Sequence, residues 1–596
     1  MSPEAWLMLG ILGAMFGLLI WNKLPTWMVF LGTFTVCMTL RLAPAQDMLN
    51  GFANSGVITV AALYPVAAAM YSTGAITLLS QRFIGLPKSL KAAYLKILPP
   101  TAVASAFLNN TPLVAMMIPV VRDITRMTGL SGSKIYMFVS FASILGGAST
   151  LIGTSTNLII AGLVTDAINS GQVQNMQPIT MFEPTKIGLP AAVVGMLFMM
   201  FIASRLLPKH KAETADEATK RMYRAEFVVI PNSTLAGKTV EETGLAQSAG
   251  YHLTSMTGPD GASIPVTSAT RLNENDRLEF LAEADAIPAL WATIGLKPAH
   301  SAGPKAGKDR HEHSLVEVVV SARAISVGHR ISELPLPGSP YNVHIVGVSR
   351  QGQAPEISLA DWRVEAGDSG VLEVDDAFFY ENRSEVDFIL KKRLKGYSVQ
   401  RVDRSVAAIA ITVAMILLAA FGVMSMLNAA LLAGLAMLLS GCITPERAFR
   451  SIDWETVVVL GAAVGLAAPI TDTGLAQSLA DLLNALGSGN PNAALAAVFL
   501  GCIIMTNIIT NAAAASFMFP IALSLANSMG LDFLPFVMIM MMGTSYAFIN
   551  PAGYQTNLMV QKPGGYTFGD FAKVGLPLTI LVGIVVLVLA PIIYGF

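Results

Sequence analysis

Long apolar segments dominate the chain, and short polar breaks divide them into two blocks. A run of about 20 apolar residues is long enough to cross the hydrocarbon core of a bilayer as a helix. In the first block the pattern predicts spans near residues 5–22, 25–41, 56–75, 137–163 (broken) and 187–205. In the second block it predicts spans near residues 405–425, 427–442, 456–470, 494–512, 533–549 and 574–594.

Some of the apolar sequence is broken by Gly, Pro, Asn and Thr. These broken pieces are residues 98–120, 143–164, 502–525 and 542–560. A continuous helix satisfies its own backbone in lipid, whereas a broken helix leaves N–H and C=O groups that must be buried in protein or line a watery cavity. We therefore expect re-entrant hairpins or broken helices there, and with them the binding residues.

The two blocks repeat one another along the sequence. "LNNTPLVAMMIP" (108–119) aligns with "ITNAAAASFMFP" (509–520) at an offset of 401, and "TLIGTSTNLII" (150–160) aligns with "NPAGYQTNLMV" (550–560) at an offset of 400. Two homologous halves with broken helices in matching places are typical of secondary transporters, whose substrates bind at mid-membrane where the halves meet. We expect the second half to be inverted in the membrane relative to the first.

Charge separates a polar segment from these two blocks. The 596-residue chain is 53% hydrophobic and only 13% charged, against about 25% charged residues in ordinary soluble domains. Of its 77 Asp, Glu, Lys and Arg residues, 50 lie in residues 206–404. The chain is therefore predicted to hold a first membrane repeat (1–205), a soluble insertion, and a second membrane repeat (401–596).

The insertion also contains a repeat of its own. "AEFVVIPNSTLAGKTVEETGL" (225–245) aligns with "VEVVVSARAISVGHRISELPL" (316–336) at an offset of 91. This predicts two small α+β domains, residues 206–296 and 313–400, joined by the linker 297–312. The insertion has no CxxC, no phosphate loop and no Gly-rich dinucleotide fingerprint. We expect no enzymatic activity, no organic cofactor and no nucleic-acid partner.

Basic residues at both ends of the insertion predict its side of the membrane. "RLLPKHKAETADEATKRMYR" leaves the first block, and "KKRLKGYSVQRVDR" enters the second. Lys and Arg near span ends favour the cytoplasmic side. We therefore expect a multi-pass protein of the cell (inner) membrane with residues 206–404 in the cytoplasm.

Neutral polar side chains mark the broken segments. Asn amides and Thr hydroxyls can donate to a desolvated anion, and helix N-termini add N–H groups and a positive dipole end. A dehydrated sodium ion needs oxygens instead, which unwound carbonyls and Asn or Thr side chains supply. The four broken segments contain no Asp, Glu, Lys, Arg or His. Proton-coupled transporters usually place ionisable residues inside the membrane, so the neutral set favours sodium coupling.

Both blocks carry motifs that resemble the divalent anion/sodium symporter family, within the ion-transporter superfamily that also holds arsenite exporters. The motifs are "GFANSGVITVAALYPVAAAMYSTGA", "NNTPLVAMMIPV", "GGASTLIGTSTNLI", "ITNAAAASFMFPIAL" and "NPAGYQTNL". The insertion resembles a pair of TrkA C-terminal (RCK-C) domains, a combination similar to the sulfate-permease subgroup. The resemblance implies an elevator-type homodimer that moves two or more sodium ions with its anion.

The resemblance also implies the site. The family's Ser-Asn-Thr signature matches residues 109–111 and 510–512, and its Gly-Thr-Pro-Pro-Asn-like turns match residues 153–157 and 553–557. The implied substrate-binding residues are Asn109, Asn110, Thr111, Thr154, Ser155, Thr156, Thr510, Asn511 and Thr556. The implied sodium ligands are Asn109, Asn110, Gly153, Asn157, Thr506, Thr510, Asn511, Gly553 and Asn557.

The departures from the family pattern bear on the substrate. Both leading Ser positions are changed, to Asn109 and Thr510, the second motif ends in Ala512, and the twin prolines of the turns are replaced. We interpret this as favouring a compact tetrahedral anion such as sulfate, with a dicarboxylate next. The predicted function is a sodium-coupled symporter regulated through its insertion, by a small ligand or nucleotide.

Two other classes of function remain open. RCK-like domains gate channels elsewhere, so the insertion also suits a ligand-gated ion channel or a sensor. A proton-coupled transporter or an arsenite-type exporter would keep the same fold and change the coupling or the direction.

Overall fold

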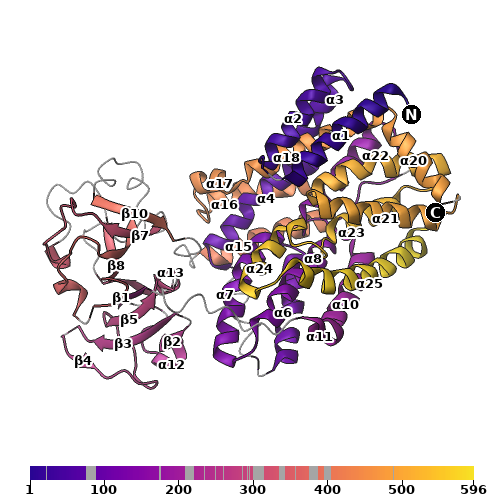
Figure 1. The fold of residues 1–596 in the computed structure, drawn as a ribbon. Coiled ribbons are helices and arrows are strands. Elements are labelled where there is room, and N and C mark those ends of the chain that lie inside the picture. Colours follow the sequence, from indigo (N-terminus) through magenta and orange to yellow (C-terminus); the bar gives the residue numbers. More distant parts are fainter. Residues whose placement is uncertain are drawn as a thin grey trace. The chain divides into compact units, whose positions relative to one another are not determined.

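The computed structural model divides into a helical unit and a sheet unit (Figure 1). The helical unit comprises Met1–Ala212 with Asp403–Phe596, and the sheet unit comprises Glu213–Val402. The structure describes residues 1–21, 23–75, 87, 89–173, 176–207, 221–231, 233, 235–248, 250–259, 261–284, 286–291, 293, 295–299, 314–333, 343–355, 357–374, 387–394, 404–487 and 489–596. Most of the expected linker and most of both basic segments therefore lie outside the described residues.

The first membrane block folds into helices of very different length. They are α1 (Pro3–Trp21), α2 (Thr26–Thr39), α3 (Ala45–Ala53), α4 (Ser55–Ser72), α6 (Leu90–Ser105), α7 (Asn110–Thr128), α8 (Tyr136–Ala148), α9 (Ser155–Asn169) and α10 (Thr185–Phe198), which continues through a π-helical turn (Met199–Ala203) into α11 (Ser204–Leu206). A short 3-10 helix, η1 (Gly132–Lys134), precedes α8. The expected break in the span 137–163 falls at residues 149–154, between α8 and α9.

The second block runs through a similar order of helices. They are α15 (Ser405–Ala420), α16 (Met426–Leu439), α17 (Pro445–Ser451), α18 (Trp454–Gly465), α19 (Ala467–Asp472), α20 (Leu475–Leu486), α21 (Pro491–Ile508), α22 (Asn511–Met529), α23 (Leu534–Ser545), α24 (Gln555–Gly564) and α25 (Phe568–Tyr594), with the 3-10 helix η9 (Pro551–Gly553) before α24. Gly74 and Gly474, 400 positions apart, both adopt left-handed backbone conformations, with φ of 69° and 76°.

One predicted span is wrong at its end. The apolar run 494–512 was expected to cross as one helix, but α21 ends at Ile508 and a separate helix begins at Asn511. Ile509 is fully extended, with φ of −124° and ψ of −179°. The break lies within residues 502–525, one of the four pieces expected to be broken.

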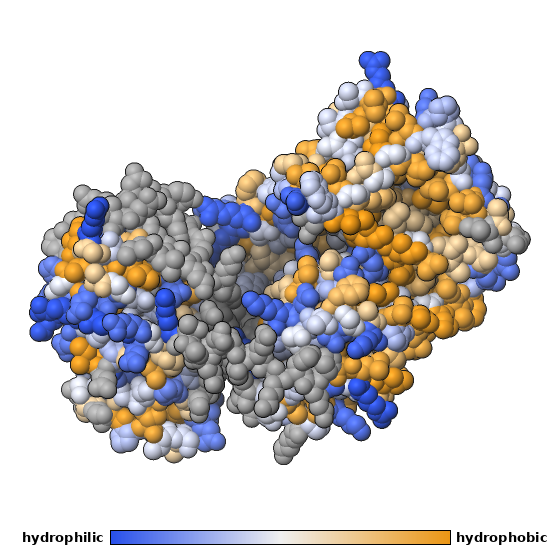
Figure 2. Space-filling view, in the orientation of Figure 1, coloured by the Kyte–Doolittle hydropathy of each residue, from blue (hydrophilic) through white to orange (hydrophobic). Residues whose placement is uncertain are grey.

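The helical unit has the features of a multi-pass membrane protein. Among the described residues, seven helices are long and apolar enough to cross a membrane. They are Pro3–Trp21, Ala45–Ser72, Thr185–Leu206, Trp454–Asp472, Pro491–Ile508, Asn511–Met529 and Phe568–Tyr594. Figure 2 shows apolar residues over much of the visible face of this unit.

The helices can be described as two packed groups, which also contact each other through α4 with α9 and α18 with α22. In one group, α4 packs on α16 and α17, and α18 packs on α2 and α3. In the other, α6 packs on α8, α21 on α23, and α10 on α25, while α7 contacts α24 and α9 contacts α22. The last two contacts join the first membrane block to the second, so the hairpins of both blocks form one body.

Helix α4 meets α9 at a close contact between the two groups. A Cβ on Gly56 would lie 2.2 Å from the backbone oxygen of Leu158, and a Cβ on Gly162 would lie 2.3 Å from Asn54 Oδ1. Asn54 caps α4 by accepting from Gly56 N at 2.9 Å, and its Nδ2 donates to Asp166 at 2.7 Å. Only glycine permits backbones to approach this closely.

The insertion forms one antiparallel sheet. Its strands in the described residues are β1 (Met222–Val229), β2 (Gln247–Ser248), β3 (Tyr251–Thr257), β4 (Ser263–Ile264), β5 (Arg277–Glu283), β6 (Leu296–Pro298), β7 (Ser314–Val320), β8 (Val343–Ser349), β9 (Ser369–Val374) and β10 (Phe388–Arg393). The order is β10-β7-β9-β8-β1-β5-β3-β2, with β4 beside β3 and β6 beside β1. Because β8 pairs with β1, the two expected small domains share a sheet.

The two parts of the insertion make matching local contacts. Gly237 and Gly328 both have left-handed backbones, with φ of 83° and 87°. Glu242 accepts the backbone N–H of Thr239, and Glu333 accepts that of Arg330. These backbone donors lower the pKa of each carboxyl below its ordinary value.

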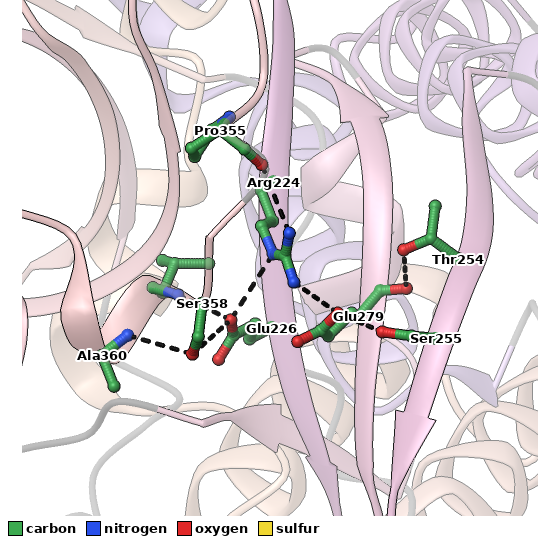
Figure 3. A network of polar contacts seen from close by, with 9 residues as sticks. Arg224, Glu226, Thr254, Ser255, Glu279, Pro355, Ser358 and Ala360 are labelled. Atoms are coloured by element: carbon green, nitrogen blue, oxygen red, sulfur yellow. Dashed lines mark hydrogen bonds and ion pairs between the residues drawn. The ribbon is translucent and has the colours of Figure 1, made fainter. Parts of the chain in front are cut away.

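A buried polar network lies where the two parts of the insertion meet (Figure 3). Arg224 on β1 contacts Glu279 at 2.6 Å and Glu226 at 3.8 Å. Glu226 is 3% exposed and accepts from Ser358 Oγ at 3.3 Å and Leu359 N at 2.8 Å. Glu226 on β1 thus accepts from residues of the second part, so this network helps to join the two parts.

Candidate functional site

Two hairpin tips lie inside the helical unit. In the first, α6 ends at Ser105 and α7 begins at Asn110. Asn109 is the N-cap of α7, and its Oδ1 accepts from Thr111 N at 3.5 Å. Pro112 fits the first turn because a helix does not use the N–H groups there. Those unused N–H groups also make each helix start a favourable place for an anion.

A cluster of oxygens lies behind the first tip. The hydroxyl of Ser105 faces Asn110 Oδ1 and the carbonyl oxygen of Ser143, the latter at 2.8 Å. Ser105 and Asn110 are 0% and 1% exposed. A hydroxyl has one proton to donate, so it cannot serve two acceptors at once. With the amide oxygen of Asn110 facing Ser105, the cluster therefore has more acceptors than donors.

The second tip repeats this cluster. The hydroxyl of Thr506 faces Asn511 Oδ1 at 2.8 Å and the carbonyl oxygen of Thr544 at 2.7 Å. Each of these residues lies 401 positions after its counterpart behind the first tip. The same surplus of oxygens therefore occurs twice.

The amide of Asn110 has two orientations with different chemistry. With its oxygen inward, that oxygen faces only acceptors, the arrangement a bound cation would satisfy. With its nitrogen inward, Asn110 donates to the carbonyl oxygens of Ser143 at 3.2 Å and Gly153 at 3.3 Å. Its oxygen then accepts from the hydroxyl of Tyr554 at 2.5 Å.

Glycines hold the turns against the tips. A Cβ on Gly147 would lie 2.5 Å from Asn110 Oδ1, and a Cβ on Gly153 would lie 2.7 Å from the backbone oxygen of Ser105. A Cβ on Gly553 would lie 3.2 Å from the backbone oxygen of Thr506. Each turn glycine thus lies beside a carbonyl of its own hairpin, and the first contact is the tighter.

Further polar contacts tie each turn to its hairpin tip. The hydroxyl of Thr150 donates to the carbonyl oxygen of Ala106. Asn550, 400 positions later, donates through Nδ2 to the carbonyl oxygen of Asn507 at 3.0 Å. Turn and tip therefore form one structural element in both halves.

Asn157 and Asn557 lie at the starts of α9 and α24, fully buried. The Nδ2 of Asn157 donates to the carbonyl oxygen of Thr150 at 2.8 Å, and that of Asn557 donates to Ala547 at 2.8 Å. The Oδ1 of Asn557 accepts from Ser140 at 2.7 Å. Both side chains thus hold the backbone of their turns.

The two halves touch directly between the turns. The hydroxyl of Tyr554 lies 3.5 Å from Thr154 Oγ1, and Thr111 Oγ1 donates to Gln555 Oε1 at 3.1 Å. Thr154 and Tyr554 occupy equivalent positions, 400 residues apart. A direct contact between equivalent residues places them where the two halves meet, and the tip residue Asn110 joins them there.

The remaining expected residues lie around this meeting point or near it. Thr156 is 1% exposed and lies 3.5 Å from Thr154. Thr556 is buried, and its hydroxyl lies 2.8 Å from that of Ser140. Ser155 is partly buried, and Thr510 is exposed at the start of α22. Asn511 bonds to Thr506 of its own hairpin.

Four residues of the site were missed by sequence reasoning. Ser105, Ser140, Tyr554 and Gln555 all contact an expected site residue. Subtracting the 401-residue offset from Thr506 would have found Ser105. Tyr554 and Gln555 stood inside a quoted motif as departures from it, while Ser140 lies in an apolar run that gives no signal.

The candidate site is uncharged. No Asp, Glu, Lys, Arg or His occurs in the four broken segments. Across the described residues, no group of three or more His, Cys, Asp or Glu is placed to hold a metal ion. What the site offers is neutral oxygens behind the tips, and hydroxyls, amides and helix N-termini in front of them.

Comparison with known proteins gives the family. Residues 16–543 match the citrate transporter family. The chain is 30% identical to the "Putative sulfur deprivation response regulator" of Chlamydomonas reinhardtii over 92% of this chain and 95% of that protein. It is 27% identical to an uncharacterized transporter of Synechocystis sp. over 94% of this chain and 92% of that protein. It is 23% identical to the "Probable sodium/sulfate cotransporter 3" of Chlamydomonas reinhardtii over 92% of this chain and 84% of that protein.

The family match covers both hairpins and the first turn, and it ends within α23, before the second turn. The resemblance read from the motifs is thereby confirmed at the level of the family, and the apolar helices agree with it. The chain belongs to the citrate transporter family of the ion-transporter superfamily, and it is a multi-pass membrane transporter of anions.

Proposed function

We propose that this protein couples the import of a divalent anion to sodium, with sulfate as the first candidate and a dicarboxylate as the second. The observation that carries the proposal is the pair of matching oxygen clusters at Ser105–Asn110 and Thr506–Asn511. Each cluster has a surplus of acceptors when its Asn oxygen faces inward, and a bound cation would satisfy that arrangement. With its nitrogen inward, Asn110 itself donates to the first cluster.

Sodium suits these clusters better than a proton or a divalent metal. Proton-coupled transporters usually use an acidic or basic side chain inside the membrane, and the broken segments contain no Asp, Glu, Lys, Arg or His. Calcium sites draw on several carboxylates. Hydroxyl, amide and carbonyl oxygens at unwound helix breaks are the ligands with which transporters hold sodium. We assign one sodium ion to each cluster, with Gly153 and Gly553 contributing their carbonyl oxygens.

The anion would lie in front of the clusters, where the halves meet. The starts of α7, α9 and α24 come together there, joined by the contacts of Asn110, Thr111 and Thr154 with the second turn. Helix starts and hydroxyls offer the donors that an oxyanion needs. The naming of one relative as a sodium/sulfate cotransporter supports sulfate.

The Asn residues of the tips provide a physical route for coupling. An amide has an oxygen for a cation and a nitrogen for an anion. A sodium ion behind the tip fixes the amide oxygen inward and adds positive charge beside the anion. Each ligand then raises the affinity for the other, as reciprocity of binding free energies requires.

Movement of one helix group against the other would carry the bound ions across the membrane. We assign the moving group to α6–α10 and α21–α25, and the scaffold to α1–α4 and α15–α18, in a homodimer with an inverted second repeat. The glycine contact between α4 and α9 lies on the boundary. A disulfide or a short cross-linker joining Asn54→Cys to Asp166→Cys should stop uptake until it is reduced. Full uptake by the cross-linked protein would contradict the elevator assignment.

The insertion is assigned a cytoplasmic, regulatory role as two RCK-C-like domains that bind a small ligand or nucleotide. Deletion of residues 215–395 should alter the regulation of uptake more than the choice of anion. A changed ratio of sulfate to succinate uptake in the deletion variant would contradict this assignment.

The proposed function is tested in proteoliposomes that contain the purified full-length protein. Uptake of labelled sulfate and labelled succinate is measured with an inward sodium gradient, with choline in place of sodium, and with a proton gradient alone. We expect sulfate uptake that requires sodium. Uptake of neither anion, or uptake indifferent to sodium, would overturn the proposal. Single-channel currents in a planar bilayer would support the channel class instead.

A further inference from the structure

We propose that Tyr554 is the specificity-determining residue of the anion site, where its hydroxyl donates to the anion and its ring limits the anion's size. This inference rests on the proposed function and names the substrate class more narrowly, as a compact tetrahedral oxyanion. It concerns a residue that the two halves do not share, since the equivalent position in the first half is Thr154.

The position of Tyr554 places its hydroxyl among the expected anion ligands. It directly precedes α24 in an extended conformation, with φ of −146° and ψ of 134°. Its hydroxyl lies 2.5 Å from the amide of Asn110 and 3.5 Å from Thr154 Oγ1. One side chain from the second half therefore reaches both a tip and a turn of the first half.

The hydroxyl replaces one that the second tip lacks. In the first tip, Thr111 carries a hydroxyl, and the corresponding residue of the second tip is Ala512. Ala512 is 5% exposed, so that position offers the anion no donor from its side chain. The phenol of Tyr554 supplies a hydroxyl donor in the second half. This donor comes from the turn instead of the tip, and it lies at the end of a longer and more rigid side chain.

The neighbouring residue closes the same side of the site. Gln555 accepts from Thr111 at 3.1 Å, and its amide also has two N–H donors. An aromatic ring and an amide thus stand where the family's turn carries a threonine and the first of its two prolines. A phenol ring is larger than a threonine side chain, so the space at the meeting point is smaller and favours a compact anion over an extended one.

The hydroxyl also links the anion to the cation behind the first tip. With no anion, the phenol donates to the oxygen of Asn110, whose nitrogen then faces the oxygen cluster. An anion that takes the phenolic proton as a hydrogen bond releases that oxygen. The amide can then turn its oxygen toward the cluster, where sodium would bind. One hydroxyl thereby couples the two sites.

The test compares two tyrosines of the same membrane unit. Tyr554→Phe removes the hydroxyl at the site, and Tyr554→Thr restores the residue type of the equivalent position. The matched control is Tyr546→Phe, because Tyr546 is fully buried and its hydroxyl contacts only a sulfur, that of Met542 at 3.3 Å, in the contacts of the described residues. All are measured in the full chain in proteoliposomes, with labelled sulfate and labelled succinate under a sodium gradient.

We expect Tyr554→Phe to raise the KM for sulfate by about tenfold or more, the effect of losing one hydrogen bond to a charged ligand. Tyr554→Thr should raise the ratio of succinate to sulfate uptake at least fivefold. Tyr546→Phe should leave both values within about twofold of the wild type. Sulfate should also raise the apparent sodium affinity less in Tyr554→Phe than in the wild type.

The failure of this inference can be told from the failure of the proposed function. Sodium-driven sulfate uptake by the wild type with an unchanged KM in folded Tyr554→Phe would overturn the inference alone. Wild-type protein that prefers succinate to sulfate would also overturn it, whatever the variants do. Uptake of neither anion by the wild type would overturn both. Thermal unfolding of each variant shows whether it is folded.

Discussion

The two hairpins of the helical unit share a frame of contacts and differ in the side chains in front of it. Behind each tip, a hydroxyl faces an amide oxygen and a carbonyl oxygen at positions 401 residues apart. In front, Thr111 and Thr154 of the first half correspond to Ala512 and Tyr554 of the second. The contacts that both hairpins share suit a cation, because each half can bind one in the same way. The side chains that differ between the halves suit a single anion, which contacts both halves at once.

The frames also differ in how tightly they are packed. Asn110 is 1% exposed and lies among glycines, whereas Asn511 is only partly buried. A buried polar group that loses its partners costs more than an exposed one. The first cluster is therefore the more rigid, and we expect substitutions there to have the larger effects.

The largest effect is expected from removing the tip amides. Asn110→Ala should lower sodium-driven uptake about 100-fold, because it removes the buried side chain proposed as a cation ligand together with its hydrogen bonds. Asn511→Ala should lower uptake about tenfold. Initial rates at several sodium concentrations measure both. Equal losses of uptake in the two variants would show that the difference in burial between Asn110 and Asn511 does not affect transport.

The next effect concerns the turn glycines. Gly153→Ala forces a Cβ to within 2.5 Å of the Gly147 carbonyl oxygen and should destabilise the protein by about 1–3 kcal/mol. Gly553→Ala meets nothing closer than 3.2 Å and should cost less than about 1 kcal/mol. Thermal unfolding in detergent compares the two. A larger loss in Gly553→Ala would contradict the packing difference.

A smaller effect is expected from the hydroxyls of the clusters. Ser105→Ala and Thr506→Val each remove one oxygen and should raise the sodium concentration for half-maximal uptake by about three- to tenfold. The KM for sulfate at saturating sodium should change by less than about twofold. If sulfate affinity falls more than sodium affinity, the clusters bind the anion. That result would contradict the assignment of sodium behind the tips and of the anion in front of them.

The smallest effect separates the two tips in their contact with the anion. Thr111→Ala should raise the KM for sulfate by about threefold, because its hydroxyl is at the meeting point of the halves. Ala512→Thr should change that KM by less than about twofold, since Tyr554 already supplies a donor there. If Ala512→Thr changes the KM for sulfate more than Thr111→Ala does, the anion contacts the second tip more closely than the first.

The sequence predicted the frame better than the front of the site. The offsets of 400 and 401 located Asn110, Asn511 and both turn glycines, because backbone breaks require particular residue types at particular spacings. The same reasoning gave Asn157 and Asn557 as sodium ligands, which stays a prediction: their amide nitrogens hold the turn backbones, and the buried Oδ1 of Asn157 has no hydrogen-bond partner among the described residues. Pattern reasoning fixes where a residue stands in the chain, but not which way its amide faces.

The front of the site depends on contacts between distant residues. Tyr554 and Asn110 lie 444 positions apart, and nothing in either local sequence predicts that a phenol meets an amide. Ser140 sits in a helix of buried apolar residues, where a lone serine usually bonds its own backbone. Its contacts with Thr556 and Asn557 appear only when α8 packs on α24.

The insertion shows the same limit. Its repeat was visible at an offset of 91, and the matching glycines and glutamates have matching local conformations. The pairing of β8 with β1, which joins the two parts in one sheet, rests on a contact between residues more than 120 positions apart. Local pattern therefore predicts each part and is silent on how the parts combine.

The central claim is that sodium binds behind each tip and the anion binds between the tips and turns. Electron cryo-microscopy maps of the full-length protein in nanodiscs, prepared in sodium sulfate and in choline chloride, test it most directly. The account predicts sodium-dependent density within each oxygen cluster and tetrahedral density against Tyr554 and Thr111 in the first map only. Identical maps with both tip amides turned nitrogen-inward, or anion density behind the tips, would contradict it.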